Sequence, residues 1–257
     1  MVKVITVNVN GLRSAAKKHL WDYLEIENAD FICFQEIRAS ESDLLDSVKN
    51  PLGLHLLWHQ AEKKGYSGVA IYSKTPPQKV QIGIGCPIID REARYLRADF
   101  EPFSIVSLYL PSGTVSEQRQ TFKYWCLDYF LPELKELIKL KKKFLIAGDW
   151  NIAHQNIDLK NWRANQKHSG FLPEERAWLS QVLQLGWVDV WRKLYPDVPG
   201  YTWWSNRGKA YEKDVGWRID YQIASPELGA LAQSAFVYKE KKFSDHAPLV
   251  VNYALEH

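Results

Sequence analysis

Apolar segments with the pattern of buried strands repeatedly meet acidic or amide side chains at one end, and this feature constrains the fold most. The segments at 2–9, 30–36 and 144–151 run into polar residues, while those at 217–224 and 247–253 have polar residues near their start. Each polar residue alone is explained as a turn or capping residue. Because an unpaired charge in a core is costly, five such places favour one shared site at one end of the β-structure. The polar residues are Asn8, Asn10, Gln35, Glu36, Asp149, Asn151, Asp220, Asp245 and His246.

The order of strand and helix patterns indicates a layered α/β fold. Further strand patterns at 66–73, 95–100 and 103–110 have short connections, so part of the sheet structure is antiparallel. Strands both alternate with helices and follow one another directly. We therefore predict a four-layered α/β sandwich, with two mixed β-sheets packed face to face and helices outside. The alternative is a doubly wound parallel sheet. The helical patterns span residues 19–27, 116–140 and 174–185.

Composition fits an ordinary folded protein, which we expect to be one domain over residues 1–257. Hydrophobic residues make up 46% and charged residues 25% of the chain. The net charge of +3 permits a nucleic-acid partner without requiring one. The sequence contains no apolar run near the ~20 residues that span a bilayer, and its N-terminus becomes polar too soon for a signal peptide. Three scattered cysteines argue against a disulfide framework or a structural zinc site, so we expect a reduced, cytoplasmic protein without membrane association.

The donor types at the strand ends favour a hard divalent cation. Carboxylates and amides, with few histidines and no cysteine among them, suit Mg²⁺ or Mn²⁺. Asp245 and His246 add a titratable pair directly before the last strand. A hard metal ion together with a histidine that an aspartate orients is a combination suited to phosphate-ester hydrolysis.

Five segments in a fixed order carry a resemblance to a known family. They resemble the signature blocks of the exonuclease III family of apurinic/apyrimidinic (AP) endonucleases, within the endonuclease/exonuclease/phosphatase superfamily. The likeness extends from about residue 2 to residue 253, and ordered blocks are far more specific than any one of them. The five segments are NVNGLR (8–13), FQE (34–36), GDWNIAH (148–154), VGWRIDY (215–221) and SDHAPL (244–249). Further matching segments are KKGYSGVA (63–70), LYLPSGT (108–114), NIDLKN (156–161) and SGFLPEER (169–176).

The resemblance implies a set of metal ligands. Glu36 resembles the carboxylate that holds Mg²⁺, helped by Asn8 and Asn10, and Asp245 resembles a further ligand of the metal or the leaving group. Mn²⁺ is an alternative ion, and either one or two ions are compatible with these residues. The side chains expected around the metal are Glu36, Asn8, Asn10, Asp245, Asp149, Asn151 and His246.

The resemblance also implies catalytic roles. Asp149 resembles the residue that activates or orients the attacking water, and Asn151 resembles the amide that fixes the scissile phosphate. Asp220 resembles the acid that orients His246, which either contacts the phosphate or takes a proton from water. Tyr109 resembles the phenol beside the phosphate and the leaving oxygen.

Aromatic and basic residues are expected to select and grip the substrate. Trp203, Trp217 and Ile219 resemble the walls of a pocket for a flipped-out abasic sugar. The alternative, in a chain with 11 tryptophans, is that both of these tryptophans are core residues. Expected DNA contacts come from Arg13, Lys17, Lys18, Lys63, Lys64, Tyr66 and the loop at 161–170, in which Asn165 resembles a phosphate contact. Some relatives have Asn in place of His168, Gly in place of Ala93, and an Arg that inserts into the DNA in place of Val115. Arg207 and Lys209 are candidates to replace that Arg.

The expected function is Mg²⁺-dependent cleavage of double-stranded DNA 5′ to an abasic site, by a monomer associated with the nucleoid if the source is bacterial. The same site is expected to act as a 3′-phosphatase, 3′-phosphodiesterase and 3′→5′ exonuclease. A second hypothesis is a phosphohydrolase of phospholipids or inositol phosphates, which the tryptophan pocket and residues 156–176 disfavour. A third is a non-catalytic module that binds damaged DNA, which would require the loss of Glu36, Asp149, Asp220 or His246.

Overall fold

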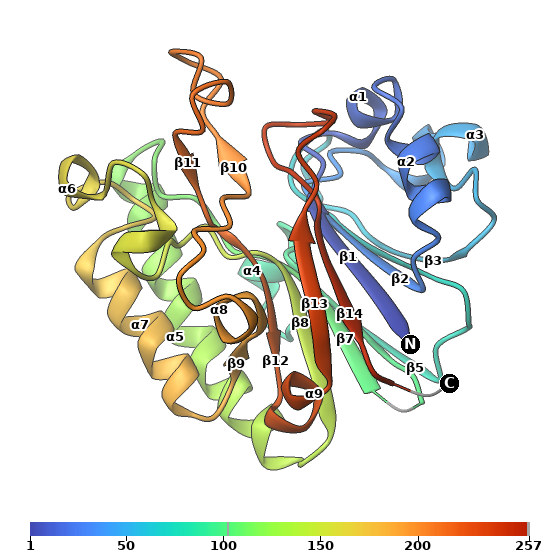
Figure 1. Cartoon of the computed structure of the whole chain (residues 1–257). Coiled ribbons are helices and arrows are strands. Elements are labelled where there is room, and N and C mark those ends of the chain that lie inside the picture. Colours follow the sequence, from blue (N-terminus) through green and yellow to red (C-terminus); the bar gives the residue numbers. More distant parts are fainter. Residues whose placement is uncertain (102, 256–257) are drawn as a thin grey trace.

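Two six-stranded mixed β-sheets pack face to face in the computed structural model, which describes residues 1–101 and 103–255 (Figure 1). The pairs β1–β2 and β7–β8 are parallel, and the other neighbouring strands are antiparallel. The prediction of a layered sandwich is confirmed, and the alternative of a doubly wound parallel sheet is wrong. The first sheet has the order β13 (Ala232–Val237), β14 (Leu249–Tyr253), β1 (Val2–Asn8), β2 (Phe31–Gln35), β4 (Val69–Ser73) and β3 (His55–His59). The second has the order β5 (Lys79–Ile82), β6 (Tyr95–Asp99), β7 (Phe103–Tyr109), β8 (Lys143–Asp149), β12 (Asp220–Ala224) and β9 (Val188–Asp189).

The core lies between the two sheets and also between each sheet and its helices. Val4 and Cys33 of the first sheet belong to the same buried cluster as Ile105 and Leu145 of the second. Strands β2 and β4 are buried at every position, which is why their sequences are continuous apolar runs without alternation.

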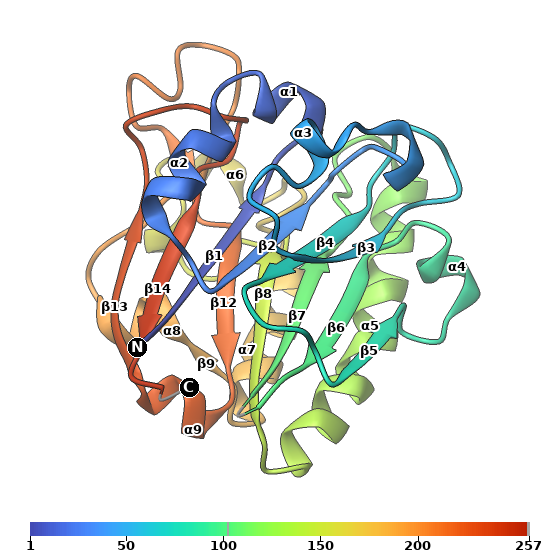
Figure 2. The same ribbon diagram turned by 90° about the vertical axis from the view of Figure 1, so that its right-hand side faces the viewer.

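Helices cover the outer faces of the sandwich (Figures 1 and 2). Helices α1 (Leu12–Ala16), α2 (Leu20–Glu27) and α3 (Asp46–Lys49) lie over the first sheet. Helices α5 (Glu117–Lys139) and α7 (Pro173–Gln184) lie over the second. In the described part of the chain no helix is both long and apolar enough to cross a membrane. The shorter helices are α4 (Pro87–Asp90), α6 (Trp162–Asn165), α8 (Val190–Leu194), α9 (Pro226–Ala230) and the 3₁₀ turns Glu41–Asp43 and Asn156–Asp158.

The strand predicted at 217–224 is divided in two. Its first part is β11 (Gly216–Trp217), which pairs with β10 (Trp203–Trp204) in a separate two-stranded ribbon. Its second part is β12 in the large sheet. Arg218, buried between them, ion-pairs with Asp158 and Asp189, and its main-chain N–H donates to the Asp158 carbonyl at 2.8 Å. These bonds draw the chain out of the ribbon and into the sheet. The β10–β11 ribbon projects from the end of the sandwich opposite the two termini (Figure 1).

Candidate active site

Strand register brings the predicted polar residues to one edge of the sandwich. Asn8 lies opposite Gln35 because β1 and β2 are parallel and end together. Asp149 lies opposite Tyr109 on the parallel strand β7 and opposite Asp220 on the antiparallel strand β12. This edge is also where the β10–β11 ribbon emerges (Figure 1). The expectation of one shared site is therefore matched by the geometry.

His246 is held by a buried aspartate. Its Nδ1 lies 2.8 Å from Asp220 Oδ2, and its Nε2 lies 3.8 Å from Asp149 Oδ2. Its main-chain N–H donates to Ser244 Oγ at 3.0 Å, and that hydroxyl donates to the Asn8 carbonyl at 2.6 Å. Burial alone would lower the pKa of His246, but the carboxylate of Asp220, helped by Asp149, raises it to about 10. The imidazole is therefore a cation at neutral pH.

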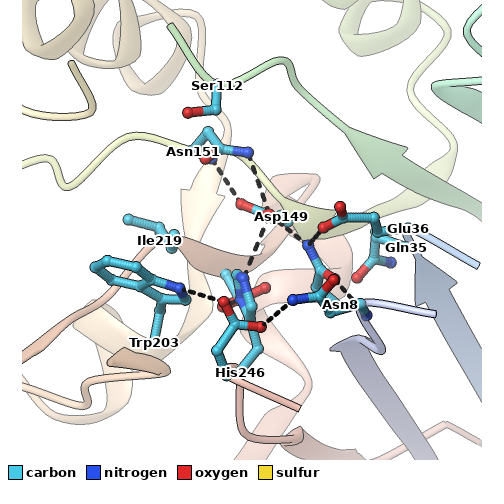
Figure 3. A network of polar contacts seen from close by, with 12 residues as sticks. Asn8, Gln35, Glu36, Ser112, Asp149, Asn151, Trp203, Ile219 and His246 are labelled. Atoms are coloured by element: carbon cyan, nitrogen blue, oxygen red, sulfur yellow. Dashed lines mark hydrogen bonds and ion pairs between the residues drawn. The ribbon is translucent and has the colours of Figure 1, made fainter. Parts of the chain in front are cut away.

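Asp149 occupies the centre of the polar network (Figure 3). Its Oδ2 accepts a hydrogen bond from Asn8 Nδ2 at 2.9 Å, and its Oδ1 accepts one from the Asn151 N–H at 2.9 Å. Burial raises the pKa of Asp149 to about 7, opposed by the nearby His246 cation. A carboxylate with a pKa near neutrality is suited to accept a proton from water.

Two asparagine amides hold the outer carboxylates of the site. Asn8 Nδ2 donates to Glu36 Oε2 at 3.0 Å as well as to Asp149. Asn10 Nδ2 donates to Asp245 Oδ1 at 2.8 Å, and the Asn10 N–H donates to Asn8 Oδ1 at 2.9 Å. Each amide thus positions carboxylates that were predicted as metal ligands.

The donor chemistry of this edge fits a divalent cation. The ligand atoms of Asp149, Asp220 and His246 lie within 4.8 Å of one another. As a cation, His246 would not ligate the ion, and its Nδ1 already contacts Asp220 Oδ2. The remaining predicted ligands carry oxygen donors, which suit a hard ion: the carboxylates of Glu36, Asp149 and Asp245 and the amides of Asn8, Asn10 and Asn151. Glu36 also pairs with Arg38.

Asn151 and Tyr109 flank Asp149. Asn151 has a φ of 51° in the left-handed region, and its Nδ2 donates to the Leu110 carbonyl at 2.8 Å and to Asp149 Oδ2 at 3.1 Å. Burial, together with the nearby Glu36 carboxylate, raises the pKa of Tyr109 well above its usual range. The phenol therefore stays protonated and available as a hydrogen-bond donor.

An aromatic wall stands beside His246. Trp203 and Trp217 pair across the β10–β11 ribbon, with ring centroids 6.1 Å apart and planes at 84°. The Trp203 ring lies 6.5 Å from the His246 ring, and its Nε1 donates to Asp245 Oδ2 at 3.0 Å. Ile219 joins both tryptophans in one apolar cluster. Both tryptophans are only partly buried, and Figure 3 shows Trp203 and Ile219 beside the polar network. Their role as pocket walls stays a prediction.

The predicted DNA contacts lie on surfaces flanking this edge. Helix α1 carries Arg13 on one side of the edge and α6 carries Asn165 on the other, followed by the exposed His168 (Figure 1). Lys63 lies 5.4 Å above the Tyr66 ring. Their contacts with DNA stay predictions. Among the departures from relatives, Val115 is 82% exposed, and Ala93 is buried with a φ of 51°.

Several supporting residues escaped the sequence analysis. Phe171 is fully buried and packs edge-on against Trp217, with centroids 6.5 Å apart. Thr202 Oγ1 accepts from the N–H groups of Ile219 and Asp220, which fixes the peptide bond between these two residues. Phe171 lies within the matching segment 169–176 and Thr202 directly precedes Trp203, but only the structure connects them to the site.

Comparison with known proteins assigns the chain to a family. Residues 5–246 match the Endonuclease/Exonuclease/phosphatase family. The exodeoxyribonuclease of Bacillus subtilis is 38% identical over 255 residues, covering 98% of this chain and 100% of that protein. The DNA repair nuclease APEX1 of Danio rerio is 37% identical, covering 99% of this chain and 83% of that protein. The structure of an AP endonuclease from Archaeoglobus fulgidus superposes with a TM-score of 0.90 at 27% identity, covering 99% of this chain and 100% of that one. The chain therefore belongs to the endonuclease/exonuclease/phosphatase family and is an enzyme of its AP endonuclease and exodeoxyribonuclease type.

Proposed function

We propose that the protein hydrolyses the phosphodiester bond 5′ to an abasic site in duplex DNA, leaving a 3′-hydroxyl, and that it also processes blocked 3′ ends. The observation that carries this proposal is the buried Asp149–His246–Asp220 arrangement directly beside the Trp203–Trp217 wall. Relatives named for exodeoxyribonuclease and AP endonuclease activity support both parts. Since one chain supplies every residue of the site, we propose that a monomer suffices.

The charge states of the central residues suggest their roles. Asp149, with a pKa of about 7, accepts the proton of the attacking water. His246, as a cation with Nε2 turned toward Asp149, donates to a phosphate oxygen and stabilises the developing charge. Asn151 fixes the phosphate, and the protonated Tyr109 phenol donates near the leaving oxygen. These roles favour His246 as a phosphate contact over His246 as a base.

The ion proposed for the site is Mg²⁺, with Mn²⁺ as a substitute. The family uses divalent metal ions, and ligand atoms of Asp149, Asp220 and His246 lie within 4.8 Å of one another. We propose that Glu36, Asp149 and Asp245 provide the oxygen ligands. Asn8 and Asn10 hold these carboxylates in place. When bound, such an ion would supply positive charge to the phosphate and the leaving oxygen.

Substrate choice is proposed to depend on the pocket between the two tryptophans and Ile219. A sugar without a base fits an apolar pocket that a full nucleotide would overfill, and it loses less stacking energy when it leaves the duplex. Trp203 also donates to Asp245, so the pocket wall is tied to a carboxylate of the site.

Three matched duplexes test the proposal: one with a single abasic site, one with a 3′-phosphate at a nick, and one intact. We expect rapid cleavage of the first, dephosphorylation of the second, slow attack on the third, and loss of all activities with a chelator. Asp149→Asn serves as the inactive control. Hydrolysis of a phosphoinositide with no cleavage of any duplex would overturn the proposal.

A further inference from the structure

A fully buried ion pair lies beneath the candidate active site. Lys123 on α5 and Glu175 on α7 have no exposed side-chain surface, and Lys123 Nζ lies 2.6 Å from Glu175 Oε1. Buried ion pairs contribute little net stability, because removing two charges from water offsets much of their attraction. The contacts at each end of this pair indicate another use.

The lysine end holds Asn151. Lys123 Nζ donates to the Asn151 carbonyl oxygen at 2.8 Å. Asn151 has a φ of 51°, and a residue other than glycine keeps such a conformation only when its surroundings impose it. The Asn151 N–H is fixed by Asp149 Oδ1 and its amide by the Leu110 carbonyl. Lys123 therefore fixes the main-chain carbonyl of Asn151, which these bonds leave free. In this way it also fixes the direction of the Asn151 side-chain amide.

The glutamate end holds the loop behind the aromatic wall. Glu175 Oε2 accepts from the N–H groups of Gly170 at 2.7 Å and Leu172 at 3.0 Å. The Gly170 backbone packs so closely on the Trp217 ring that a Cβ at Gly170 would lie 3.2 Å from it. The Gly170 carbonyl in turn accepts from the Ala153 N–H at 2.7 Å, two residues after Asn151.

We propose that Lys123 and Glu175 are positioning residues that join the phosphate-fixing Asn151 to the pocket wall at Trp217, so that catalysis and sugar selection share one support. This inference rests on the proposed function. Charge-assisted bonds are short and directional, so the ion pair sets the relative position of two groups that come from different segments.

The test compares wild-type protein with Lys123→Met and with Lys123→Met/Glu175→Gln. The double variant removes the ion pair without leaving a lone buried charge. Small misplacements of reacting groups are expensive in rate, so we expect Lys123→Met to lower kcat on abasic duplex about ten- to a hundredfold with little change in KM. In the double variant we expect a similar loss, and also a fall of at least about threefold in the ratio of cleavage of abasic to intact duplex. An uncharged amide holds the Gly170 and Leu172 N–H groups, and so the loop behind Trp217, less firmly than the carboxylate does.

Leu137→Ala is the matched control. Leu137 is buried on the same helix, about 21 Å along its axis from Lys123, so this change lowers the melting temperature without touching the site. The inference would be overturned if both pair variants kept the wild-type kcat and substrate ratio. It would also be overturned if Leu137→Ala, with a melting temperature equal to that of the pair variants, showed the same losses. If Lys123→Met, with its lone buried Glu175 charge, does not fold, the kcat and substrate ratio of the double variant decide. A wild-type protein that leaves abasic duplex intact would instead refute the proposed function.

Discussion

Replacing Asp220 by asparagine separates the two possible roles of His246. The change keeps the size of the side chain but removes the charge that lies 2.8 Å from the imidazole Nδ1. In the wild type that charge raises the pKa of His246 to about 10 against the effect of burial. Without it, burial lowers the pKa against the weaker effects of Asp149 and Asp245, and we expect the pKa to fall toward the ordinary value of 6.5.

The size of the effect follows from the fraction of His246 that is protonated. At pH 8 a pKa of about 10 leaves nearly all of the imidazole charged, whereas a pKa of 6.5 leaves roughly 3%. At pH 6 the two proteins differ less than about twofold in this fraction. We therefore expect the ratio of wild-type to Asp220→Asn kcat/KM on abasic duplex to grow more than about tenfold between pH 6 and pH 8. This growth comes on top of a loss from poorer orientation that does not depend on pH.

A ratio far below one at pH 6 would refute the reasoning. If His246 were the general base, the lower pKa would place more of it in its active neutral form at every pH, so Asp220→Asn would be faster than the wild type. The growth of the ratio with pH would be the same for either role, so the level of the ratio decides between them. His246→Gln is the control, because it has no imidazole to titrate. Stability gives an independent measurement, since a raised pKa stabilises the fold below pH 6.5 and this contribution is lost as the pH rises through about 10. Urea unfolding should show that Asp220→Asn lacks this decline.

Four further outcomes are expected. Asp149→Asn should reduce turnover at least about a thousandfold while abasic DNA still binds in a gel-shift assay, because an amide cannot accept a proton; near-normal turnover would exclude it as the base. Trp217→Ala should lower kcat/KM on abasic duplex about ten- to a hundredfold, the scale of about 1–3 kcal/mol for a stacking contact, and should reduce discrimination against intact duplex; a lower melting temperature with an unchanged ratio would make it a core residue. DNA affinity measured by fluorescence anisotropy should fall at least about tenfold between roughly 50 and 200 mM salt; a flat response would place the DNA elsewhere. Removing divalent ions with a chelator should abolish cleavage, and readdition of Mg²⁺ should restore it; cleavage that persists would exclude a metal-dependent site.

The sequence was informative where chemistry and periodicity coincide. Asn8, Asp149 and Asp220 stand at the ends of apolar strands, so their convergence followed from the rule that buried strands avoid unpaired charge. The long helices α5 and α7 were predicted from their apolar spacing and confirmed within one or two residues. The register that places Asp149 between Tyr109 and Asp220 was not predictable, because it depends on pairing between strands distant in sequence.

The unpredicted elements lack a strong local signal. Strand β5 is four residues long and largely exposed, and β3 is only partly buried, so neither shows a clear apolar run. The division between β11 and β12 depends on the buried ion pairs of Arg218 with Asp158 and Asp189. A buried arginine inside a strand-like sequence gives no sign of its partners, which lie 60 and 29 residues away.

The balance of charge explains why the site needs both an ion and a basic rim. Its carboxylates outnumber its cations, so the site by itself repels the phosphate that it must attack. A divalent ion among the carboxylates reverses that repulsion locally, whereas exposed basic groups such as Arg13 and Lys63 attract the DNA backbone from outside. Salt screens the exposed groups strongly and the buried ones weakly. Loss of affinity in salt and loss of cleavage in chelator should consequently be separable, the first acting on binding and the second on turnover. The groups that set this balance are Glu36, Asp149, Asp220 and Asp245 on one side and Arg38 and His246 on the other.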